Sequence, residues 1–162
     1  IGAVLYHLVQ RRNLIEIPVS ERKHARHRLH RYILLVSVLV FALLAFFTSL
    51  NHIYCGIIAL FTGALATLYC RPDLKGKIWI GGLLFSLLYF LYFGSILPFY
   101  PDYVELYWNL EALSQVLILG IPLEELLFAF SFGMLWSSLY EHLYWQKLVK
   151  ELKPKLNPYG SL

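Results

Sequence analysis

The sequence predicts an all-α protein, a polytopic bundle of transmembrane helices. Hydrophobic residues occupy 59% of its 162 positions and the mean hydropathy is +0.60, whereas soluble domains average roughly 45 to 50% apolar residues. The Lys and Arg residues gather in three short segments between long apolar runs, which is typical of the loops that join membrane helices. We therefore expect an integral membrane protein with about four full spans, plus the end of a truncated upstream helix.

The N-terminal part of the chain predicts the end of a helix, a basic segment and one full span. Residues 1–10 are largely apolar and run into two arginines, so we expect them to be the last turns of an upstream helix. Residues 11–31 hold seven Lys or Arg and form the basic segment. Residues 32–50 are mostly apolar and approach the ~20 residues that a membrane helix needs, which predicts the first span.

A second span is predicted over residues 53–70, after a short polar turn. It is rich in small residues, and Gly56 and Gly63 at helical spacing indicate a close contact with another helix. Both cysteines, Cys55 and Cys70, fall in this helix, where about 1.5 Å per residue separates them by roughly 22 Å. That separation is beyond the reach of a disulfide, so we interpret both as packing residues.

The third span is predicted over residues 78–97, after the charged loop 71–77. The loop that follows, residues 98–111, contains three acids and no Lys or Arg, so we place it on the outer side. The basic segment, the 71–77 loop and the C-terminal tail hold all the Lys and Arg of the chain, and we place these three on the cytoplasmic side.

The last apolar segment, residues 112–145, is too long for one perpendicular span, and Gly120 and Pro122 offer a break. A helix that begins at Pro122 would put the following acids near the outer interface. A kinked helix that begins near Ala112 would put them closer to the middle of the membrane, and both geometries stay open. The tail, residues 146–162, is predicted to be a frayed cytoplasmic end.

Two adjacent carboxylates, Glu124 and Glu125, stand inside this last apolar segment. Between residues 78 and 146 no Lys or Arg is present to pair with them. Because a charge inside a membrane is costly, an acid there is a functional-site hypothesis, and we take both as candidate catalytic residues. The structural alternative is that acids after Pro122 belong to the first turn of a helix, where the helix dipole stabilises them.

Helical spacing places the two carboxylates on different faces of the predicted helix. The face of Glu124 is partly polar, and the face of Glu125 is aromatic. The first face continues with Phe128, Ser131, Leu135, Ser138 and His142, and the second with Ala129, Phe132, Trp136 and Leu143.

The pair and its aromatic neighbours predict acid-initiated carbocation chemistry on an apolar substrate. Two carboxyl groups close together in a low-dielectric site disfavour each other's ionisation, so that at least one keeps its proton near neutral pH. Aromatic rings stabilise a nearby cation through their quadrupoles. The candidate rings are Phe128, Phe132, Trp136 and, from the third span, Tyr89 and Tyr92. The candidate substrate contacts are Pro122, Phe128, Phe132, Trp136 and Asn109. We expect Asn109, in the loop before the helix, to close over the acids.

Other site classes have less support in the sequence. No glycine-rich phosphate loop or dinucleotide motif is present, so we expect no cofactor. The basic clusters fit membrane topology better than nucleic-acid binding. His24, His27 and His30 lie three apart, as metal ligands can, but no acid or cysteine stands beside them and basic residues surround them. We therefore expect no metal ion.

The acidic motif resembles that of the lycopene cyclase domain family of small membrane proteins. In that family a Pro-x-Glu-Glu motif precedes a Phe-rich membrane helix that ends in Tyr-Glu, and the loop before it often carries Trp-Asn. The matching residues here, within a resemblance that covers roughly Arg71 to Tyr144, are Pro122, Glu124, Glu125, Phe128, Tyr140, Glu141, Trp108 and Asn109.

The resemblance implies a multi-helix membrane enzyme of carotenoid synthesis that works as a heterodimer or a fused tandem repeat. Its reaction would be a redox-neutral isomerisation. An acid protonates the terminal double bond of linear lycopene, the cation closes to a six-membered ring, and a base removes a proton. Either Glu124 or Glu125 would be the acid, and the other its partner or the closing base. The usual arrangement has two such motifs and one is visible here, so the implied partners are a second homologous subunit or repeat, membrane lipids and a long polyene. The implied location is the bacterial inner membrane, with the C-terminus in the cytoplasm.

Two other functions remain open from the sequence. One is a non-catalytic small subunit of a larger membrane complex, which would hold a carotenoid or lipid and bond its two glutamates to a partner. The other is a proton or ion pathway through Glu124, Ser131, Ser138 and His142, which Leu135 and the surrounding phenylalanines make less suitable for water.

Overall fold

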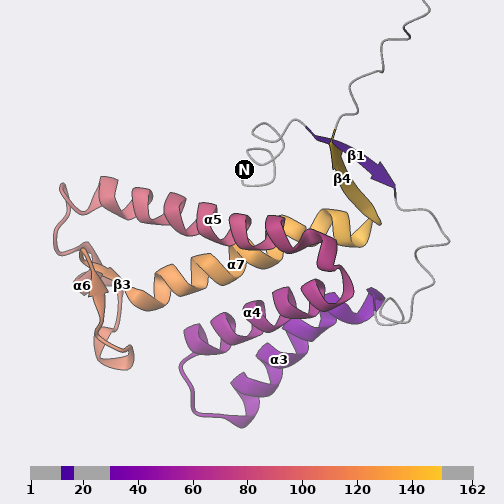
Figure 1. The fold of residues 1–162 in the computed structure, drawn as a ribbon. Helices are drawn as coiled ribbons and strands as arrows, with labels where there is room; N and C mark the ends of the chain where they lie inside the picture. Colours follow the sequence, from indigo (N-terminus) through magenta and orange to yellow (C-terminus); the bar gives the residue numbers. More distant parts are fainter. Residues whose placement is uncertain (1–11, 17–29, 151–162) are drawn as a thin grey trace, which may run out of the picture.

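The computed structural model describes residues 12–16 and 30–150, and this part of the chain is mostly helical (Figure 1). Its helices are α3 (Ile33–Phe47), α4 (His52–Cys70), α5 (Lys75–Ile96), α6 (Tyr103–Tyr107) and α7 (Leu123–Leu143), with the 3-10 turns η2 (Pro72–Leu74) and η3 (Leu110–Ala112). Its short strands are β1 (Arg12–Glu16), β2 (Leu117–Ile118), β3 (Ile121–Pro122) and β4 (Gln146–Lys150).

Helix α7 joins two halves of the bundle. It lies along α5 for most of its length and also packs against α4, which in turn pairs with α3 (Figure 1). Tyr54 near the start of α4 bonds to the start of α7, and Arg71 just after α4 bonds to the end of α7, so these two helices run in the same direction. Helix α5 runs the opposite way, because Lys77 at its start meets Glu141 at the end of α7.

Small residues bring α5 and α7 into close contact. A Cβ atom added to Gly133 would lie 2.6 Å from the carbonyl oxygen of Gly81 and 2.5 Å from Cβ of Phe85. A Cβ atom added to Gly82 would lie 2.7 Å from the Met134 side chain. The two backbones can approach this closely only because these positions are glycine, as is common where membrane helices pack.

The close contact predicted for the small residues of α4 is confirmed. A Cβ atom on Gly56 would come within 3.2 Å of the Phe128 ring of α7, and one on Gly63 would overlap the Ser37 side chain of α3. Cys55 and Cys70 are both free and buried in this helix, as expected for packing residues.

Four full spans, as expected from the apolar runs, are not supported by the described residues. Two helical stretches are long and apolar enough to cross a membrane, His52–Cys70 and Pro72–Ile96. Helix α3 has 15 residues and rises roughly 22 Å, less than the hydrocarbon core of about 30 Å. Helix α7 has 21 residues but contains three glutamates.

The apolar surface of α5 faces outward. Only 22% of its most apolar window is buried inside the protein, and a stripe of leucines at helical spacing, Leu83, Leu87 and Leu91, is 53 to 62% exposed. A soluble protein rarely leaves so large an apolar face in water, so this exposure indicates association with a membrane.

Two small sheets modify the expectation of an all-α fold. Strand β1, within the basic segment, pairs antiparallel with β4, so Arg12 stands opposite Lys150 and Glu16 opposite Gln146. The first five residues of the tail are therefore a paired strand, and the prediction of a frayed end is wrong for residues 146–150. The upstream helix predicted over residues 1–10 and the rest of the tail, residues 151–162, lie outside the described residues.

The second sheet settles where α7 begins. Strands β2 and β3 form a hairpin in which Ile118 pairs with Ile121, and the two turn residues, Leu119 and Gly120, have φ of 52° and 84°. Such a two-residue turn is typical of a type I′ hairpin. Pro122 then precedes the first helical residue, Leu123. Of the two geometries left open, the helix that begins at Pro122 is the one found, and residues 112–122 are not part of it.

Candidate functional site

The two glutamates of the acidic motif lie in the first turn of α7 and are buried. Glu124 is 2% exposed and Glu125 is 9% exposed. Pro122 caps the helix with extended backbone geometry, and the free N–H groups of a first helical turn favour acidic side chains. Burial excludes most water from both carboxyl groups, so other protein groups must satisfy their oxygens.

The carboxylate of Glu125 accepts a hydrogen bond on each oxygen. The indole Nε1 of Trp108 donates to Oε1 at 2.8 Å, and the phenol of Tyr89 donates to Oε2 at 2.8 Å. Trp108 comes from the loop after α6 and Tyr89 from the middle of α5. Glu125 therefore ties that loop to α5 and α7.

The carboxyl group of Glu124 has its partners on one oxygen. The Tyr54 hydroxyl of α4 donates to Oε1 at 2.6 Å, and the backbone N–H of Ser114 donates to the same atom at 2.8 Å. The other oxygen, Oε2, is buried and has no hydrogen-bond partner within the described part of the chain. A buried carboxylate oxygen without a donor is costly, because burial removes the water that would otherwise bond to it.

The adjacent acids thus bond to different parts of the protein. Glu124 bonds to α4 and the segment after η3, and Glu125 bonds to α5 and the segment after α6. No salt bridge to either acid occurs within residues 12–16 and 30–150, in agreement with the absence of Lys and Arg nearby. Hydrogen bonds from neutral groups take the place of a salt bridge.

A row of aromatic rings begins one helical turn after Glu124. Phe128 stacks on Phe132 with centroids 6.4 Å apart, and Phe132 stacks on Trp136 at 5.6 Å. From the sequence we assigned Phe128 to the face of Glu124, and Phe132 and Trp136 to the face of Glu125. Side chains four residues apart lie only about 40° apart on a helix, so all three form one row.

An apolar groove of about 350 Å³ opens beside this row, between α3, α4 and α7. Its only polar side chain is Ser37, whose hydroxyl is buried and lacks a hydrogen-bond partner in the described residues. The groove reaches Gly56, two residues from Tyr54, and Phe128, four residues from Glu124. It is lined by Ser37, Val38, Phe41, Gly56, Ala59, Leu60, Phe128 and Phe132.

The predicted substrate contacts occupy different places. Phe128 and Phe132 line the groove, and Trp136 extends the ring row with its side chain 60% exposed. Pro122 is buried in the hairpin opposite Leu117. Asn109 is exposed in the loop, and its neighbour Trp108 is the residue that reaches an acid. Their roles as substrate contacts stay predictions.

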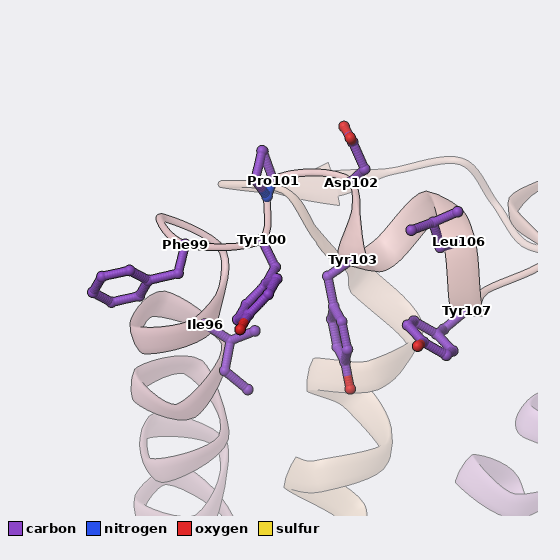
Figure 2. Close-up of a pocket in the computed structure, with 8 residues that line it drawn as sticks. All are labelled: Ile96, Phe99, Tyr100, Pro101, Asp102, Tyr103, Leu106 and Tyr107. Atoms are coloured by element: carbon purple, nitrogen blue, oxygen red, sulfur yellow. The ribbon is translucent and has the colours of Figure 1, made fainter.

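A second, larger hollow of about 620 Å³ lies at the end of α5 and under α6 (Figure 2). Figure 2 shows Tyr100 and Tyr103 with their rings between the two helices, while the carboxylate of Asp102 points away from them. Neither glutamate lines this hollow. Tyr103 packs against Trp108, with ring centroids 5.6 Å apart, and so supports the residue that bonds to Glu125.

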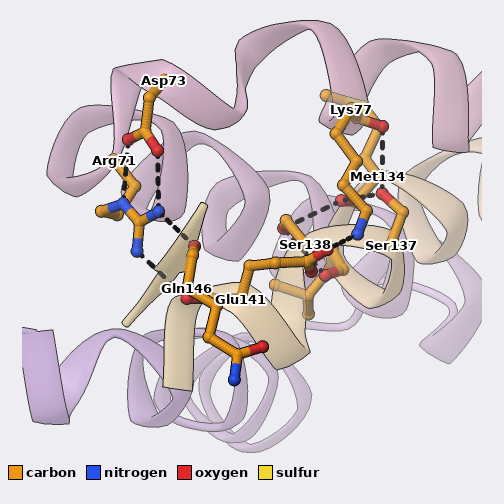
Figure 3. A network of polar contacts seen from close by, with 9 residues as sticks. Arg71, Asp73, Lys77, Met134, Ser137, Ser138, Glu141 and Gln146 are labelled. Atoms are coloured by element: carbon orange, nitrogen blue, oxygen red, sulfur yellow. Dashed lines mark hydrogen bonds and ion pairs between the residues drawn. The ribbon is translucent and has the colours of Figure 1, made fainter. Parts of the chain in front are cut away.

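The opposite end of the bundle carries a separate polar network (Figure 3). Lys77 of α5 forms a buried ion pair with Glu141 of α7, and the side chains are 3% and 1% exposed. Arg71 pairs with Asp73 at 2.7 Å and also donates to the backbone carbonyls of Glu141 and Gln146. These contacts join η2 and the start of α5 to the end of α7.

The polar stripe proposed as a relay does not form a hydrogen-bonded chain in the described residues. Glu124, Ser131, Ser138 and His142 are all buried. The Ser138 hydroxyl, however, donates to the backbone carbonyl of Leu135 in its own helix. Serine side chains often bond to their own helix in this way, so the contact of Ser138 favours a packing role over a relay.

Sequence reasoning missed several residues of the site. Tyr54 and Ser114, the donors to Glu124, carry no local signal, because Tyr54 lies 70 residues away along the chain. Tyr89 was expected to stabilise a cation, whereas its hydroxyl donates to Glu125. Lys77 directly precedes residues 78–146, the segment without Lys or Arg. Its pairing with Glu141 depends on the antiparallel packing of α5 and α7.

Comparison with known protein families matches residues 51–143 to the family described as lycopene cyclase. This range contains both glutamates, all four of their hydrogen-bond donors, and helices α4, α5 and α7. Searches of curated proteins and of solved structures give no match. The family match agrees with the resemblance of the acidic motif and extends it to α4, the helix that supplies Tyr54.

Proposed function

The chain belongs to the lycopene cyclase family, and we propose that it is a membrane-embedded intramolecular isomerase that closes the end of a linear carotenoid into a ring. In this reaction an acid adds a proton to the terminal double bond. The resulting carbocation is attacked by a neighbouring double bond of the same chain, which forms the six-membered ring. Loss of a proton from the ring restores a double bond. One proton is gained and one is lost, so the steps balance without an oxidant or reductant.

Glu124 is the acid in this proposal. The observation that carries it is the buried oxygen Oε2, which has no hydrogen-bond partner in the described residues, while Oε1 accepts two hydrogen bonds. A proton on Oε2 leaves both bonds intact. Tyr54 and Ser114 then stabilise the carboxylate that remains when the proton is transferred, which strengthens the acid.

Glu125 is the charged partner of that acid. Both of its oxygens accept hydrogen bonds, from Trp108 and from Tyr89. A carboxylate held in this way would stabilise a cation that forms near the start of α7. It also holds the loop that carries Trp108 against the bundle.

The apolar groove that Phe128 lines, one helical turn after Glu124, is the proposed site for the end of the polyene. Its volume of about 350 Å³ lies within the range of small-molecule sites, roughly 300 to 1,000 Å³. Its lining is almost entirely apolar, as a hydrocarbon substrate requires. Phe128 and Phe132 present aromatic rings there, and their quadrupoles would stabilise the carbocation.

The proposed setting is the bacterial inner membrane, and the proposed partner is a second homologous subunit or repeat with its own acidic motif. The outward apolar face of α5 supports a membrane location. Strand β1 of the basic segment, the loop after α4 and the start of the tail meet at the end of the bundle opposite the glutamates. Basic residues favour the cytoplasmic side, so the C-terminus would lie there and the acids near the outer interface.

The test is pigment analysis by chromatography of lycopene-accumulating bacteria that express the full-length protein, with and without a homologous partner subunit. We expect a cyclic carotene in at least one of these strains. Glu124→Gln, which keeps the shape of the side chain and removes the acid, should abolish conversion. Glu125→Gln should reduce it, because the neutral amide loses the negative charge and accepts fewer hydrogen bonds.

Glu111→Gln is the matched control, because Glu111 is an exposed acid of the loop before α7. All variants are compared at equal amounts in the membrane, measured by immunoblot. Conversion that survives Glu124→Gln at the wild-type level would contradict the assignment of the acid. A wild-type protein that is present in the membrane with its partner and makes no cyclic product would favour the non-catalytic subunit.

A further inference from the structure

Three metal-binding side chains meet at the end of the bundle opposite the glutamates. His30 stands just before α3, Cys70 is the last residue of α4, and His142 lies in the last turn of α7. The side chains come from three elements that are far apart in the sequence. All three are buried, with exposed fractions of 6%, 0% and 1%.

Two of the three ligand atoms, Sγ of Cys70 and Nδ1 of His30, are spaced as for a shared small ion. One ligand atom from each residue lies within 4.8 Å of the other two, and Sγ of Cys70 lies 3.6 Å from Nδ1 of His30. In a tetrahedral zinc site with bonds of about 2.3 Å to sulfur and about 2.0 to 2.1 Å to nitrogen, these two atoms lie roughly 3.5 Å apart. The pair is therefore already at the distance that a shared ion requires.

The surroundings of the two imidazoles resemble the supporting contacts of metal ligands. Nε2 of His142 lies 3.3 Å from the backbone carbonyl oxygen of His30. Metal-binding histidines commonly donate one ring N–H to a carbonyl in this way, which turns the other nitrogen toward the ion. The His30 ring is also held between His142 and Trp145, at centroid distances of 4.0 and 3.8 Å.

The charge balance near the cluster does not oppose a cation. Arg71 follows Cys70 directly, but its guanidinium forms two hydrogen bonds with the Asp73 carboxylate, at 2.8 and 2.7 Å. A thiolate and two neutral imidazoles carry one negative charge, which a buried divalent ion would more than neutralise. Sulfur and imidazole ligands together suit Zn²⁺ better than Mg²⁺ or Ca²⁺, which prefer oxygen.

We propose that His30, Cys70 and His142 form a binding site for a divalent transition-metal ion of the zinc type. The ion would join the start of α3 to the ends of α4 and α7, and a water molecule or another donor would complete its coordination. The two imidazole planes, which are 20° apart and stacked, would open on binding so that both point toward the ion. The site does not depend on the proposed cyclisation, because it lies roughly 27 Å along α7 from Glu124.

Cobalt titration of the purified protein tests the proposal directly. The full-length protein is purified in detergent, freed of any affinity tag and treated with a chelator. Co²⁺ is then added and the absorption spectrum recorded. We expect one equivalent to bind with a thiolate-to-cobalt charge-transfer band, and excess Zn²⁺ to remove that band. Cys70→Ser should abolish the band and weaken binding by at least ~10-fold.

Two controls separate the site from general effects. Cys55→Ser removes the other buried cysteine of α4 and should leave the band unchanged. His142→Asn should weaken binding, whereas His52→Asn, at an exposed histidine of the same chain, should not. Wild-type protein that binds less than one equivalent, or a band that Cys70→Ser leaves in place, would overturn the proposal.

A second measurement on the wild type avoids any dependence on how the variants fold. The two cysteines are alkylated with a maleimide, with and without Zn²⁺, and each is quantified by mass spectrometry of its peptide. We expect Zn²⁺ to slow the modification of Cys70 by at least ~10-fold, because a bound thiolate does not react freely, and to leave Cys55 unaffected. Equal rates at Cys70 with and without Zn²⁺ would overturn the proposal.

Discussion

Adjacent glutamates at the start of α7 have the same chemistry but different environments. Successive residues of a helix point about 100° apart, so Glu124 faces α4 while Glu125 faces α5. Each glutamate has two hydrogen-bond donors, and the four donors come from four different segments. Together they satisfy three of the four carboxyl oxygens. The fourth oxygen, Oε2 of Glu124, has no hydrogen-bond partner in the described residues, and this distinguishes Glu124 from Glu125.

Removal of the Tyr54 hydroxyl tests the bonding of Glu124 at the level of a single atom. Tyr54→Phe deletes the 2.6 Å hydrogen bond to Glu124 and should lower both cyclase activity and stability, the latter by about 0.5 to 1.5 kcal/mol, as for a hydrogen bond between neutral groups. The measurements are pigment conversion and thermal unfolding in detergent. Tyr100→Phe is the control, because Tyr100 is 67% exposed. Equal behaviour of the two variants would contradict the role of Tyr54.

The buried pair of Lys77 and Glu141 provides a second test at the residue scale. Glu141→Gln leaves the Lys77 ammonium buried without its anion, and we expect a loss of about 3 kcal/mol or more in stability. Glu105→Gln, at an exposed acid of α6, should change little. Thermal unfolding in detergent gives the comparison.

The double replacement Lys77→Met with Glu141→Leu separates lost charge from lost packing. Apolar residues of similar size often replace a buried ion pair at little cost. The double variant should therefore be more stable than Glu141→Gln alone. A double variant that is less stable would mean that the pair itself, rather than the penalty for an unpaired charge, stabilises the end of α7.

At the scale of the elements, the hairpin before α7 sets the position of the acids. Leu119 and Gly120 both have positive φ, which the tight turn between β2 and β3 requires. Leu119 is a branched residue in a region that favours glycine or asparagine, so the hairpin carries some strain. Pro122 ends the hairpin and begins the helix, and this puts Glu124 and Glu125 in the first turn.

The contact between α5 and α7 depends on glycine at position 133. Gly133→Ala would place a Cβ 2.6 Å from the Gly81 carbonyl oxygen, in contact with backbone that cannot rotate away. We expect a lower unfolding temperature and a loss of about 1 to 3 kcal/mol, as for other overpacked sites. Gly94→Ala is the control in α5, because a Cβ there meets nothing within 4 Å. Equal unfolding temperatures for Gly133→Ala and Gly94→Ala would mean that the two helices do not pack this closely.

At the scale of the whole molecule, the two ends of the bundle differ in chemistry. Glu124, Glu125 and the loop that carries Trp108 occupy one end. The paired strands β1 and β4, the Lys77–Glu141 pair and the His30, Cys70 and His142 cluster occupy the other. Roughly 27 Å of α7 separates them at about 1.5 Å per residue. This is close to the thickness of the hydrocarbon core, about 30 Å.

The exposed leucine stripe of α5 gives a test of membrane insertion. The wild-type protein should stay in the membrane pellet after an alkaline wash and dissolve only in detergent. Replacing Leu83, Leu87 and Leu91 with lysine adds roughly 2.5 to 3.5 kcal/mol per residue to insertion at the centre of a membrane. The triple variant should leave the pellet or fail to accumulate. Leu106→Lys, on the exposed side of α6, is the control. Wild-type protein that washes off would contradict the membrane location.

Much of this architecture could be predicted from residues close together in the chain. The apolar runs predict α3, α4 and α5 to within a few residues, because each helix satisfies its own backbone hydrogen bonds. The glycines of α4 predict its close packing. The number of spans could not be predicted in the same way. Residues 112–145 are mostly apolar without an obvious interruption in hydropathy, and the hairpin that shortens the helix has only a weak local signal.

The sequence by itself determined that the protein is mostly helical, that it has a membrane character and an acidic motif, and that its family is the lycopene cyclases. Only the tertiary structure decided which groups bond to each glutamate, that Lys77 pairs with Glu141, and that His30 meets Cys70 and His142. The physical reason is distance along the chain. Local patterns specify a helix within a few turns, whereas these partners come together across 10 to 112 residues only when the helices pack.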